Sequence, residues 1–464
     1  MKRNFQKFTI YFLMLAVFSI FAVEADAQSK KEIEKSKKFA KEAKKSFDKR
    51  DYKTAIKKYT DATLLAPVNG ETHFWKGRTH YELKEFDQSL GEFDMALRQG
   101  YNPPLDFYRF RGLANLEKKN FDTALEDVQK VLQVEPSNLP LNQAVGEIYL
   151  AKNSYNEALT AFQKILQLNP NNADAYYYLA SAYQKLGDYK NQQLNAWEAI
   201  KRNTNFLGES YFIVGNAAQK SKKYNEAIEA YRKSLNVKPD YNPVYHHLPD
   251  IYRVQNRFEE AIDIAKKGTT IYPNDANLLV DLSRYYSLAD QSALAIGAAQ
   301  QAVRLMPDKI TSHSSLCRAY YEDKLFEPAL KTCNTALKLD PNDGEANVYL
   351  GFTHLSLDQI DRANEYFAKA VNGLKGYTEK NPDYADGFYL LGNAYYYVKQ
   401  PKNAIDAYSR SLQLYPQFAK ARFNLGLAYF VNGNTTAARE QYNALLKQDK
   451  DLAAMLKQTL DKKQ

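Results

Sequence analysis

The sequence has only two cysteines and six histidines among its 464 residues, so few side chains suit metal binding or nucleophilic catalysis. His246 and His247 are adjacent and point apart on a helix, while His73 and His80 have no cysteine or acidic partner at ligand spacing. The sequence contains no glycine-rich phosphate loop and no nucleophile elbow. We therefore predict no catalytic residues, no cofactor and no metal site, and we expect a protein that is not an enzyme.

Long apolar runs are equally scarce, because after residue 23 no stretch approaches the ~20 apolar residues of a membrane span. The one apolar run, over 8–23, follows three basic residues and precedes the small residues Ala25 and Ala27. This pattern predicts a signal peptide over 1–27, cleaved before Gln28, and a periplasmic or otherwise exported protein. No cysteine lies near the cut, which excludes a lipid anchor. The alternative is an uncleaved anchor, because the basic residues beginning at Lys30 disfavour export.

Positive charge is concentrated at one end of the chain. Residues 28–58 contain 13 Lys and Arg against five acidic residues, a net charge of +8 that accounts for all the excess in the mature chain. Such an end, which includes a basic segment over 28–35, could contact an anionic envelope surface through long-range attraction. The simpler interpretation is a solvated N-terminal cap. We expect no nucleic-acid partner, since no base-stacking module accompanies the lysines.

A 34-residue pattern occupies most of the chain, with small residues at two fixed positions of each unit. Position 20 is alanine in ten of twelve units, as at Ala158, and position 8 is small in all but one, as at Gly146. The units are predicted to start at Ser36, Gly70, Leu105, Leu139, Ala173, Gly208, Asn242, Ala276, Ile310, Gly344, Ala385 and Ala419. Small residues at these positions let two helices approach closely, and a proline at position 32 ends the second helix.

The pattern resembles that of the tetratricopeptide repeat over about 36–450. The resemblance implies an all-α fold, a right-handed superhelical solenoid of about twelve helix-turn-helix repeats. We predict repeats 1–10 over 36–384, repeats 11 and 12 over 385–450, and a C-terminal capping helix over 451–464. Each unit needs neighbours on both sides, because one helical hairpin cannot bury its apolar stripe alone.

Two departures from the pattern are open to alternative interpretations. About seven extra residues near 372–378 either lengthen the second helix of repeat 10 or break it, and Gly373 and Gly376 favour a break that could act as a hinge. The two cysteines, Cys317 and Cys333, stand at positions 8 and 24 of repeat 9. Position 24 is expected to face position 4, which would hold the sulfurs too far apart for a disulfide, so we predict two buried thiols.

The family resemblance also implies which residues line the concave wall, namely positions 5, 9 and 12 of each first helix. In repeats 10 to 12 these positions are largely apolar and aromatic, and we predict that they form a partner-binding groove. The predicted groove residues are Val348, Phe352, Leu355, Tyr389, Asn393, Tyr396, Phe423, Leu427 and Phe430. The alternatives are cover by the C-terminal helix or self-association.

The inner wall of repeats 7 to 9 is polar and contains Arg253, Arg284 and Arg318. These side chains could hold an acidic partner or a carboxylate terminus, or they could form ion pairs within the wall, for example with Asp250. The predicted function is that of a non-catalytic scaffold or adaptor of the periplasm or envelope, which binds a partner polypeptide in its concave groove and could serve an envelope, secretion or motility complex. The alternative function is binding of a glycan or cell-wall polymer, with inner aromatic rings stacked on sugars.

Overall fold

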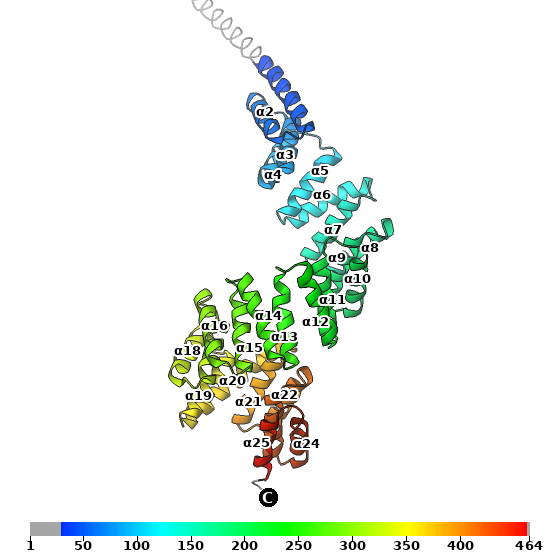
Figure 1. The fold of residues 1–464 in the computed structure, drawn as a ribbon. Coiled ribbons are helices and arrows are strands. Elements are labelled where there is room, and N and C mark those ends of the chain that lie inside the picture. The colour runs from blue at the N-terminus through cyan, green and yellow to red at the C-terminus, as the bar shows by residue number, and fades with distance from the viewer. Residues whose placement is uncertain (1–28, 462–464) are drawn as a thin grey trace, which may run out of the picture. The chain divides into compact units, whose positions relative to one another are not determined.

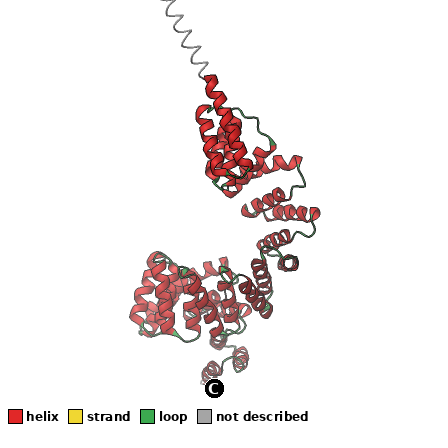
Figure 2. Ribbon diagram, turned by 45° about the horizontal axis from the view of Figure 1, so that its top comes forward, coloured by secondary structure: helices red, strands yellow, loops and turns green. Residues whose placement is uncertain are grey.

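A computed structural model describes residues 29–461, and every regular element within that range is a helix (Figure 2). The predicted signal peptide, 1–27, lies outside the described residues, as do residues 462–464. In the described part of the chain, no helix is both long and apolar enough to cross a membrane.

The helices follow one another in antiparallel pairs, one pair to each repeat (Figure 1). The pairs are 29–48 and α2 (Tyr52–Leu65), α3 (Gly70–Glu82) and α4 (Phe86–Arg98), α5 (Leu105–Glu117) and α6 (Phe121–Val134), α7 (Leu139–Ala151) and α8 (Tyr155–Leu168), α9 (Ala173–Leu186) and α10 (Tyr189–Lys201), α11 (Leu207–Lys220) and α12 (Tyr224–Val237), α13 (Asn242–Val254) and α14 (Phe258–Ile271), α15 (Ala276–Leu288) and α16 (Ser292–Leu305), α17 (Ile310–Glu322) and α18 (Phe326–Leu339), α19 (Gly344–Ser356) and α20 (Ile360–Lys380), α21 (Ala385–Tyr397) and α22 (Pro401–Leu414), and α23 (Ala419–Val431) and α24 (Thr435–Leu445). A last helix, α25 (Lys450–Asp461), follows them.

These helix pairs confirm the predicted all-helical solenoid of repeats. From the second repeat onward, each predicted start is the first residue of a helix, except that α11 begins one residue before Gly208. The turn between the paired helices has a left-handed residue at position 15, for example Lys84 (φ 60°) or Asn153 (φ 60°). That residue is often Lys, Asn or Asp, so no glycine in the sequence marks most of these turns.

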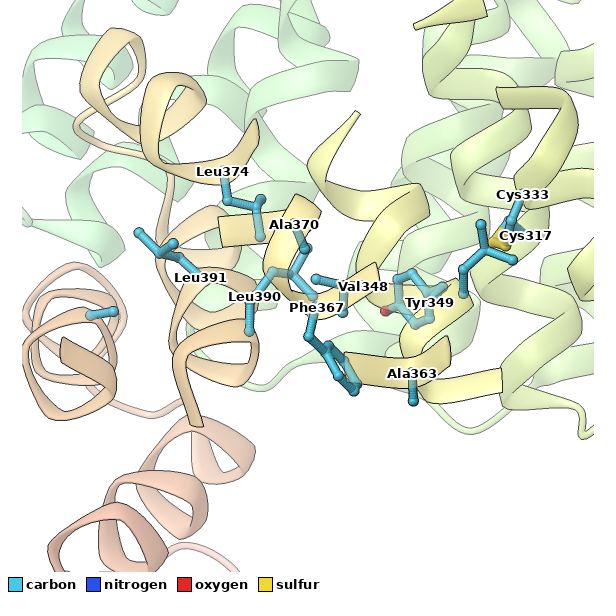
Figure 3. Packing of buried hydrophobic residues seen from close by; sticks show 13 residues of the cluster. Cys317, Cys333, Val348, Tyr349, Ala363, Phe367, Ala370, Leu374, Leu390 and Leu391 are labelled. Atoms are coloured by element: carbon cyan, nitrogen blue, oxygen red, sulfur yellow. A yellow bond between two sulfur atoms is a disulfide. The ribbon is translucent and has the colours of Figure 1, made fainter. Parts of the chain in front are cut away.

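The chain divides into two compact units, the first ending at Asn205 and the second beginning at Phe206. The first unit holds repeats 1 to 5, and its core consists of small clusters such as Phe74, Phe93 and Phe107 between consecutive repeats. The second unit holds repeats 6 to 12 and α25. One of its clusters joins repeats 9, 10 and 11 around Phe367 and Leu390 (Figure 3).

Within a repeat, the residue at position 8 packs directly against the residue at position 24. A Cβ atom added to Gly146 would lie 2.5 Å from the ring of Phe162, and one added to Gly392 would lie 2.5 Å from the ring of Tyr408. The same contact recurs between Gly77 and Phe93, Gly112 and Val128, Gly215 and Tyr231, and Gly351 and Phe367. Glycine at position 8 therefore makes room for a large side chain at position 24, and the two together hold the helices of a repeat in contact.

The prediction of two free thiols is wrong, because Cys317 and Cys333 form a disulfide with a Cα–Cα distance of 5.1 Å (Figure 3). The two cysteines occupy positions 8 and 24, which face each other in the other repeats as a glycine and a large side chain. The expectation placed position 24 opposite position 4 and so overestimated the separation of the sulfurs. In repeat 9 the covalent bond replaces the usual packing contact.

The insertion near 372–378 lengthens a helix and does not break it. Helix α20 runs without interruption for 21 residues, from Ile360 to Lys380. Gly373 is needed where α20 passes the turn before α19, because a Cβ there would collide with the carbonyl oxygen of Asn342. The prediction of a break in this helix is therefore wrong. Gly373 instead lets the backbone of α20 pass close to the turn before α19.

The last helix, α25, packs against the final repeat as the sequence predicts. Ala453, Leu456 and Leu460 are buried with Ala438 and Leu445 of α24. This helix covers apolar surface that a thirteenth repeat would otherwise have to bury.

Substituting Gly146 by alanine tests the contact between positions 8 and 24. The added Cβ would overlap the Phe162 ring, so we expect a loss of about 1–3 kcal/mol in the free energy of unfolding. Gly91 in α4 is the matched control, because a Cβ there meets nothing within 4 Å. Gly91→Ala should stabilise the protein slightly, by up to about 1 kcal/mol. Urea unfolding followed by circular dichroism measures both, and equal effects of the two substitutions would contradict the packing described.

The disulfide is tested by peptide mapping without reduction. We expect one cross-linked peptide that joins Cys317 to Cys333 and no free thiol in the purified chain. Replacing both cysteines by alanine should destabilise the second unit by about 3 kcal/mol, the loop-closure contribution of a bond across 16 residues. Quantitative alkylation of both cysteines in the native protein would contradict the pairing.

Candidate functional site

The inner arginines come from three consecutive repeats of the second unit. Arg253 lies on α13, Arg284 on α15 and Arg318 on α17. These first helices pack side by side, α13 against α15 and α15 against α17, and α17 continues the row to α19 and α21. The structure therefore brings the three predicted side chains onto one inner wall.

Arg253 is buried and fully paired within the wall. Its Nε donates to Asp250 (2.8 Å) and its Nη1 lies 3.3 Å from an oxygen of Asp386. Burial lowers the pKa of Arg253, but the carboxylates of Asp250 and Asp386 more than offset this effect and raise it. Of the two interpretations of this arginine, the structure thus shows the internal ion pair with Asp250.

Arg318 is also buried and paired. Its Nη1 donates to Glu345 at the start of α19 (2.9 Å), and its Nη2 donates to the hydroxyl of Ser315 (3.1 Å). The Nε of Arg318 is buried and has no hydrogen-bond partner. One edge of this guanidinium group is therefore satisfied and the other is not.

Arg284 is the least satisfied of the three. Its shortest ion pair, from Nη1 to Asp281, is 3.9 Å long, which exceeds hydrogen-bond distance. Its Nε is buried without a partner, and its guanidinium carbon lies 5.7 Å from the centre of the Tyr384 ring. Asp281 also lies 3.4 Å from His246, so this carboxylate is shared between two cationic groups.

Arg284 and Arg318 line a small, partly open cavity of about 110 Å³. Its lining combines hydroxyl and carboxyl groups with the rings of Tyr377 and Tyr384 and with aliphatic side chains. The lining residues are Val280, Arg284, Thr311, Ser314, Ser315, Arg318, Asp343, Gly344, Glu345, Leu374, Tyr377, Tyr384, Gly387 and Leu390. The extension of α20 supplies Leu374 and Tyr377, so the insertion in the sequence builds one wall of the cavity.

The inner surface of the second unit is closed by the chain itself, because repeat 11 and the turn before it return to repeats 6 and 7. The Tyr415 hydroxyl donates to the backbone oxygen of Arg253 (2.8 Å), and the amide of Asn256 donates to the backbone oxygen of Gln417 (3.2 Å). A surface ion pair joins Lys220 to Asp383 (3.1 Å). These residues are more than 150 positions apart in the sequence, so the contacts join opposite ends of the unit.

A second and larger cavity, of about 410 Å³, lies beside these closing contacts. It is lined mainly by polar and charged side chains, and Arg253 and Arg284 form part of it. The polar and charged residues that line it are Gln219, Lys220, Lys222, Tyr224, His246, His247, Asp250, Arg253, Asp281, Arg284, Tyr285, Asp383 and Tyr384.

The nine predicted groove residues do not form one exposed surface. Val348 and Asn393 are buried, and Asn393 accepts a hydrogen bond from the Tyr408 hydroxyl (2.7 Å). Phe352 is surrounded by the rings of Tyr321, Phe367 and Tyr397, 5.3–5.6 Å away. Leu355 packs against the same cluster.

The other predicted groove residues are divided between two further clusters. Tyr389 lies 4.7 Å from the Phe418 ring, and Tyr396 packs against the same cluster. Phe423, Leu427 and Phe430 pack on the cluster that α25 completes. These residues therefore join neighbouring repeats or support the C-terminal helix, which is one of the alternatives that the sequence left open.

The histidines have acidic or amide neighbours that sequence spacing did not reveal. Nδ1 of His73 lies 2.6 Å from Glu92, and Nδ1 of His80 lies 2.6 Å from Glu85. Asp281, followed by Asp275, raises the pKa of His246 despite its partial burial. Among residues 29–461, no three or more His, Cys, Asp or Glu side chains are grouped to hold a metal ion.

Asp343 is the one carboxyl group of the small cavity whose pKa is strongly displaced. Burial raises the pKa of Asp343 to about 6, with a further contribution from Glu345. Hydrogen bonds from the backbone of Ala346 (2.8 Å) and from Ser314 (2.8 Å) oppose this rise. The folded protein therefore binds a proton at Asp343 more tightly than the unfolded chain, whose carboxyl titrates near 3.8.

This difference predicts that Asp343 contributes more stability at pH 5 than at pH 7. The contribution is fully present below pH 3.8 and is lost as the pH rises through 6. Relative to Asp343→Asn, which keeps the helix cap, the wild type should gain about 1.3 kcal/mol between pH 7 and pH 5. Urea unfolding of both proteins at the two pH values measures the gain. A stability difference that does not change with pH would contradict the assignment.

Four segments of the chain match family models of the tetratricopeptide repeat. One model, described as TPR repeat, matches residues 146–187. Two others, described as tetratricopeptide repeat, match residues 41–103, 389–453 and 208–241. The matched segments lie in both compact units.

Two curated proteins have segments similar to this chain, one named for tetratricopeptide repeats and one named as a receptor for a targeting signal. The small glutamine-rich tetratricopeptide repeat-containing protein 2 of Saccharomyces cerevisiae is 31% identical over 120 residues, which are 25% of this chain and 32% of that protein. The peroxisomal targeting signal receptor of Candida albicans is 35% identical over 95 residues, 20% of this chain and 15% of that protein. The chain thus spans a third or less of the length of these relatives.

Solved structures show a distant overall likeness. The Cut9–Hcn1 hetero-tetramer of the APC/C aligns over 90% of this chain and 95% of that chain, with 15% identity and a TM-score of 0.41. Yeast Tom70 aligns over 85% and 96%, with 12% identity and a TM-score of 0.40. Models of the tetratricopeptide repeat thus match four segments of the chain, and each matched segment lies within the paired helices of the all-helical solenoid.

Proposed function

We propose that the protein is a non-catalytic scaffold that binds a partner polypeptide on the inner helices of its repeats. The observation that carries the proposal is the polar cavity of about 410 Å³ in the second unit, whose Lys222, His246 and Asp281 take no part in a hydrophobic core. Side chains without a packing role are free to specify a ligand. The relative named as a receptor for a targeting signal supports a polypeptide as that ligand.

The inner polar residues suit this role better than the nine aromatic and aliphatic residues predicted from the sequence. Phe352 contacts the rings of Tyr321 and Phe367, and Tyr389 contacts the rings of Tyr408 and Phe418. Removing either ring would therefore destabilise the core as well as remove a candidate contact. We therefore assign the contact surface to helices α11, α13 and α15, with the charged residues between them.

We also propose that the protein is exported, to the periplasm or an equivalent oxidising compartment. The sequence of residues 1–27 supports this location, as does the bond between Cys317 and Cys333, because structural disulfides are rare in reducing compartments. N-terminal sequencing of the protein from fractionated cells tests it, and an intact N-terminus in the cytosolic fraction would reject it.

Site-specific photo-cross-linking tests the scaffold function. A photoreactive amino acid at His246, on the inner face of α13, should give one discrete cross-linked polypeptide in intact cells. The same group at Lys267, exposed on α14 of the same repeat, is the matched control and should not. Equal cross-linking at both positions, or none at His246, would contradict binding on the inner helices, and a cross-link to glycan would support the alternative ligand.

A further inference from the structure

We propose that Arg284 and Arg318 form a binding site for a small monocarboxylate inside the second unit. The site is the small cavity of about 110 Å³ between α15, α17, α19, α20 and α21. It is distinct from the larger inner cavity proposed for the polypeptide, although Arg284 and Tyr384 border both. The inference does not depend on the scaffold function.

The first argument is the unsatisfied hydrogen-bonding capacity of the two arginines. The Nε atoms of both Arg284 and Arg318 are buried without a partner. A buried donor that has lost its water and gained nothing in return destabilises the fold, and most such groups in proteins are paired. Two of them beside one cavity indicate an acceptor that binds there.

The second argument is the local balance of charge. Arg253 is neutralised by Asp250 and Asp386, and Arg318 is neutralised by Glu345. Arg284 has one ion pair, with Asp281 at 3.9 Å, and this carboxylate also serves His246, while Asp386 and Glu345 act on Arg284 from longer range. A guanidinium group in this position lacks the close bidentate acceptor that it prefers, and a carboxylate supplies the matching planar pair of oxygens.

The third argument is the size and lining of the cavity. Its volume admits several water molecules or a small organic acid, and it is too small for a folded or extended peptide segment. Ser314 and Thr311 are hydroxyl-bearing residues of the lining, while Val280 and Leu390 offer apolar contact to a short alkyl group. Asp343 and Glu345 also border the cavity, so a singly charged acid fits better than a doubly charged phosphate.

Occupation of the site would join parts of the unit that are distant in sequence. Arg284 and Arg318 come from repeats 8 and 9, whereas Tyr384 and Gly387 come from the start of repeat 11. A ligand that contacts both sides would stabilise the closed arrangement of the unit. Ligand binding to the folded state alone raises the unfolding midpoint by mass action.

The test uses the full mature chain, with propionate as the probe. Sodium propionate should raise the thermal unfolding midpoint by a few degrees above sodium chloride at the same ionic strength. Arg284→Gln should abolish this rise and weaken propionate binding, measured by calorimetry, at least tenfold. The matched control Arg304→Gln removes an exposed arginine from α16 of repeat 8 and should leave both unchanged.

A second variant keeps the test decisive if Arg284→Gln folds poorly. Val280→Phe narrows the cavity and leaves both arginines in place, so it should also abolish the rise. Absence of a rise in the wild type, or an undiminished rise in Arg284→Gln or in Val280→Phe, would overturn the proposal. A larger rise with phosphate than with propionate would overturn the assignment to monocarboxylates. If Arg284→Gln loses the propionate effect but gives the same cross-link at His246 as the wild type, the two sites are independent.

Discussion

The packing of position 8 against position 24 determines how closely the two helices approach in repeats 2, 3, 4, 6, 10 and 11. The ring of Phe162 packs against Gly146, and the ring of Tyr408 packs against Gly392, because glycine has no side chain to exclude it. Because this contact recurs in successive repeats, the pairs share one geometry and can stack through small local clusters. The disulfide of repeat 9 occupies the same place in the hairpin, which shows that the position tolerates a bond in place of a ring.

The candidate sites occur where this regularity is interrupted. The seven residues by which α20 exceeds α18, 21 against 14, place Leu374 and Tyr377 beside Arg284, and they precede the segment that returns to repeat 7. The return encloses the inner wall through Tyr415, Asp383 and Asp386. A regular array would leave its inner helices open. The irregular one surrounds charged side chains with protein, where interactions between charges are stronger than in water.

The fold could be predicted from the sequence because it depends on local spacing, whereas the enclosed site depends on contacts that spacing does not encode. Small residues such as Gly146 and Ala158 were sufficient to locate the helix pairs. The position of Arg253, Arg284 and Arg318 on one wall also followed from the repeat. The contact of Tyr415 with Arg253, 162 residues earlier, results from the turn accumulated over several repeats and from the length of α20. No single repeat contains that information.

The two errors at the level of side chains have different physical causes. The prediction kept Cys317 and Cys333 apart because it placed position 24 opposite position 4. The pairing of glycine at position 8 with a large residue at position 24 in other repeats indicates the correct register. The aromatic residues of repeats 10 to 12 were assigned to a groove because they stand at inner positions. Rings as large as Phe352 and Tyr389 instead fill the space between successive first helices, and an apolar residue at an inner position is no proof of exposure.

The enclosure of the inner wall is tested most directly by a distance measurement within the second unit. Spin labels on cysteines introduced at Lys223 and Gln413, both exposed, would report the separation of repeats 6 and 11 while the native cysteines stay in their disulfide. The structure predicts one narrow distribution of short distances, because Lys222 donates to the backbone oxygen of Gln413. A broad distribution centred on long distances would show an open groove and contradict the account.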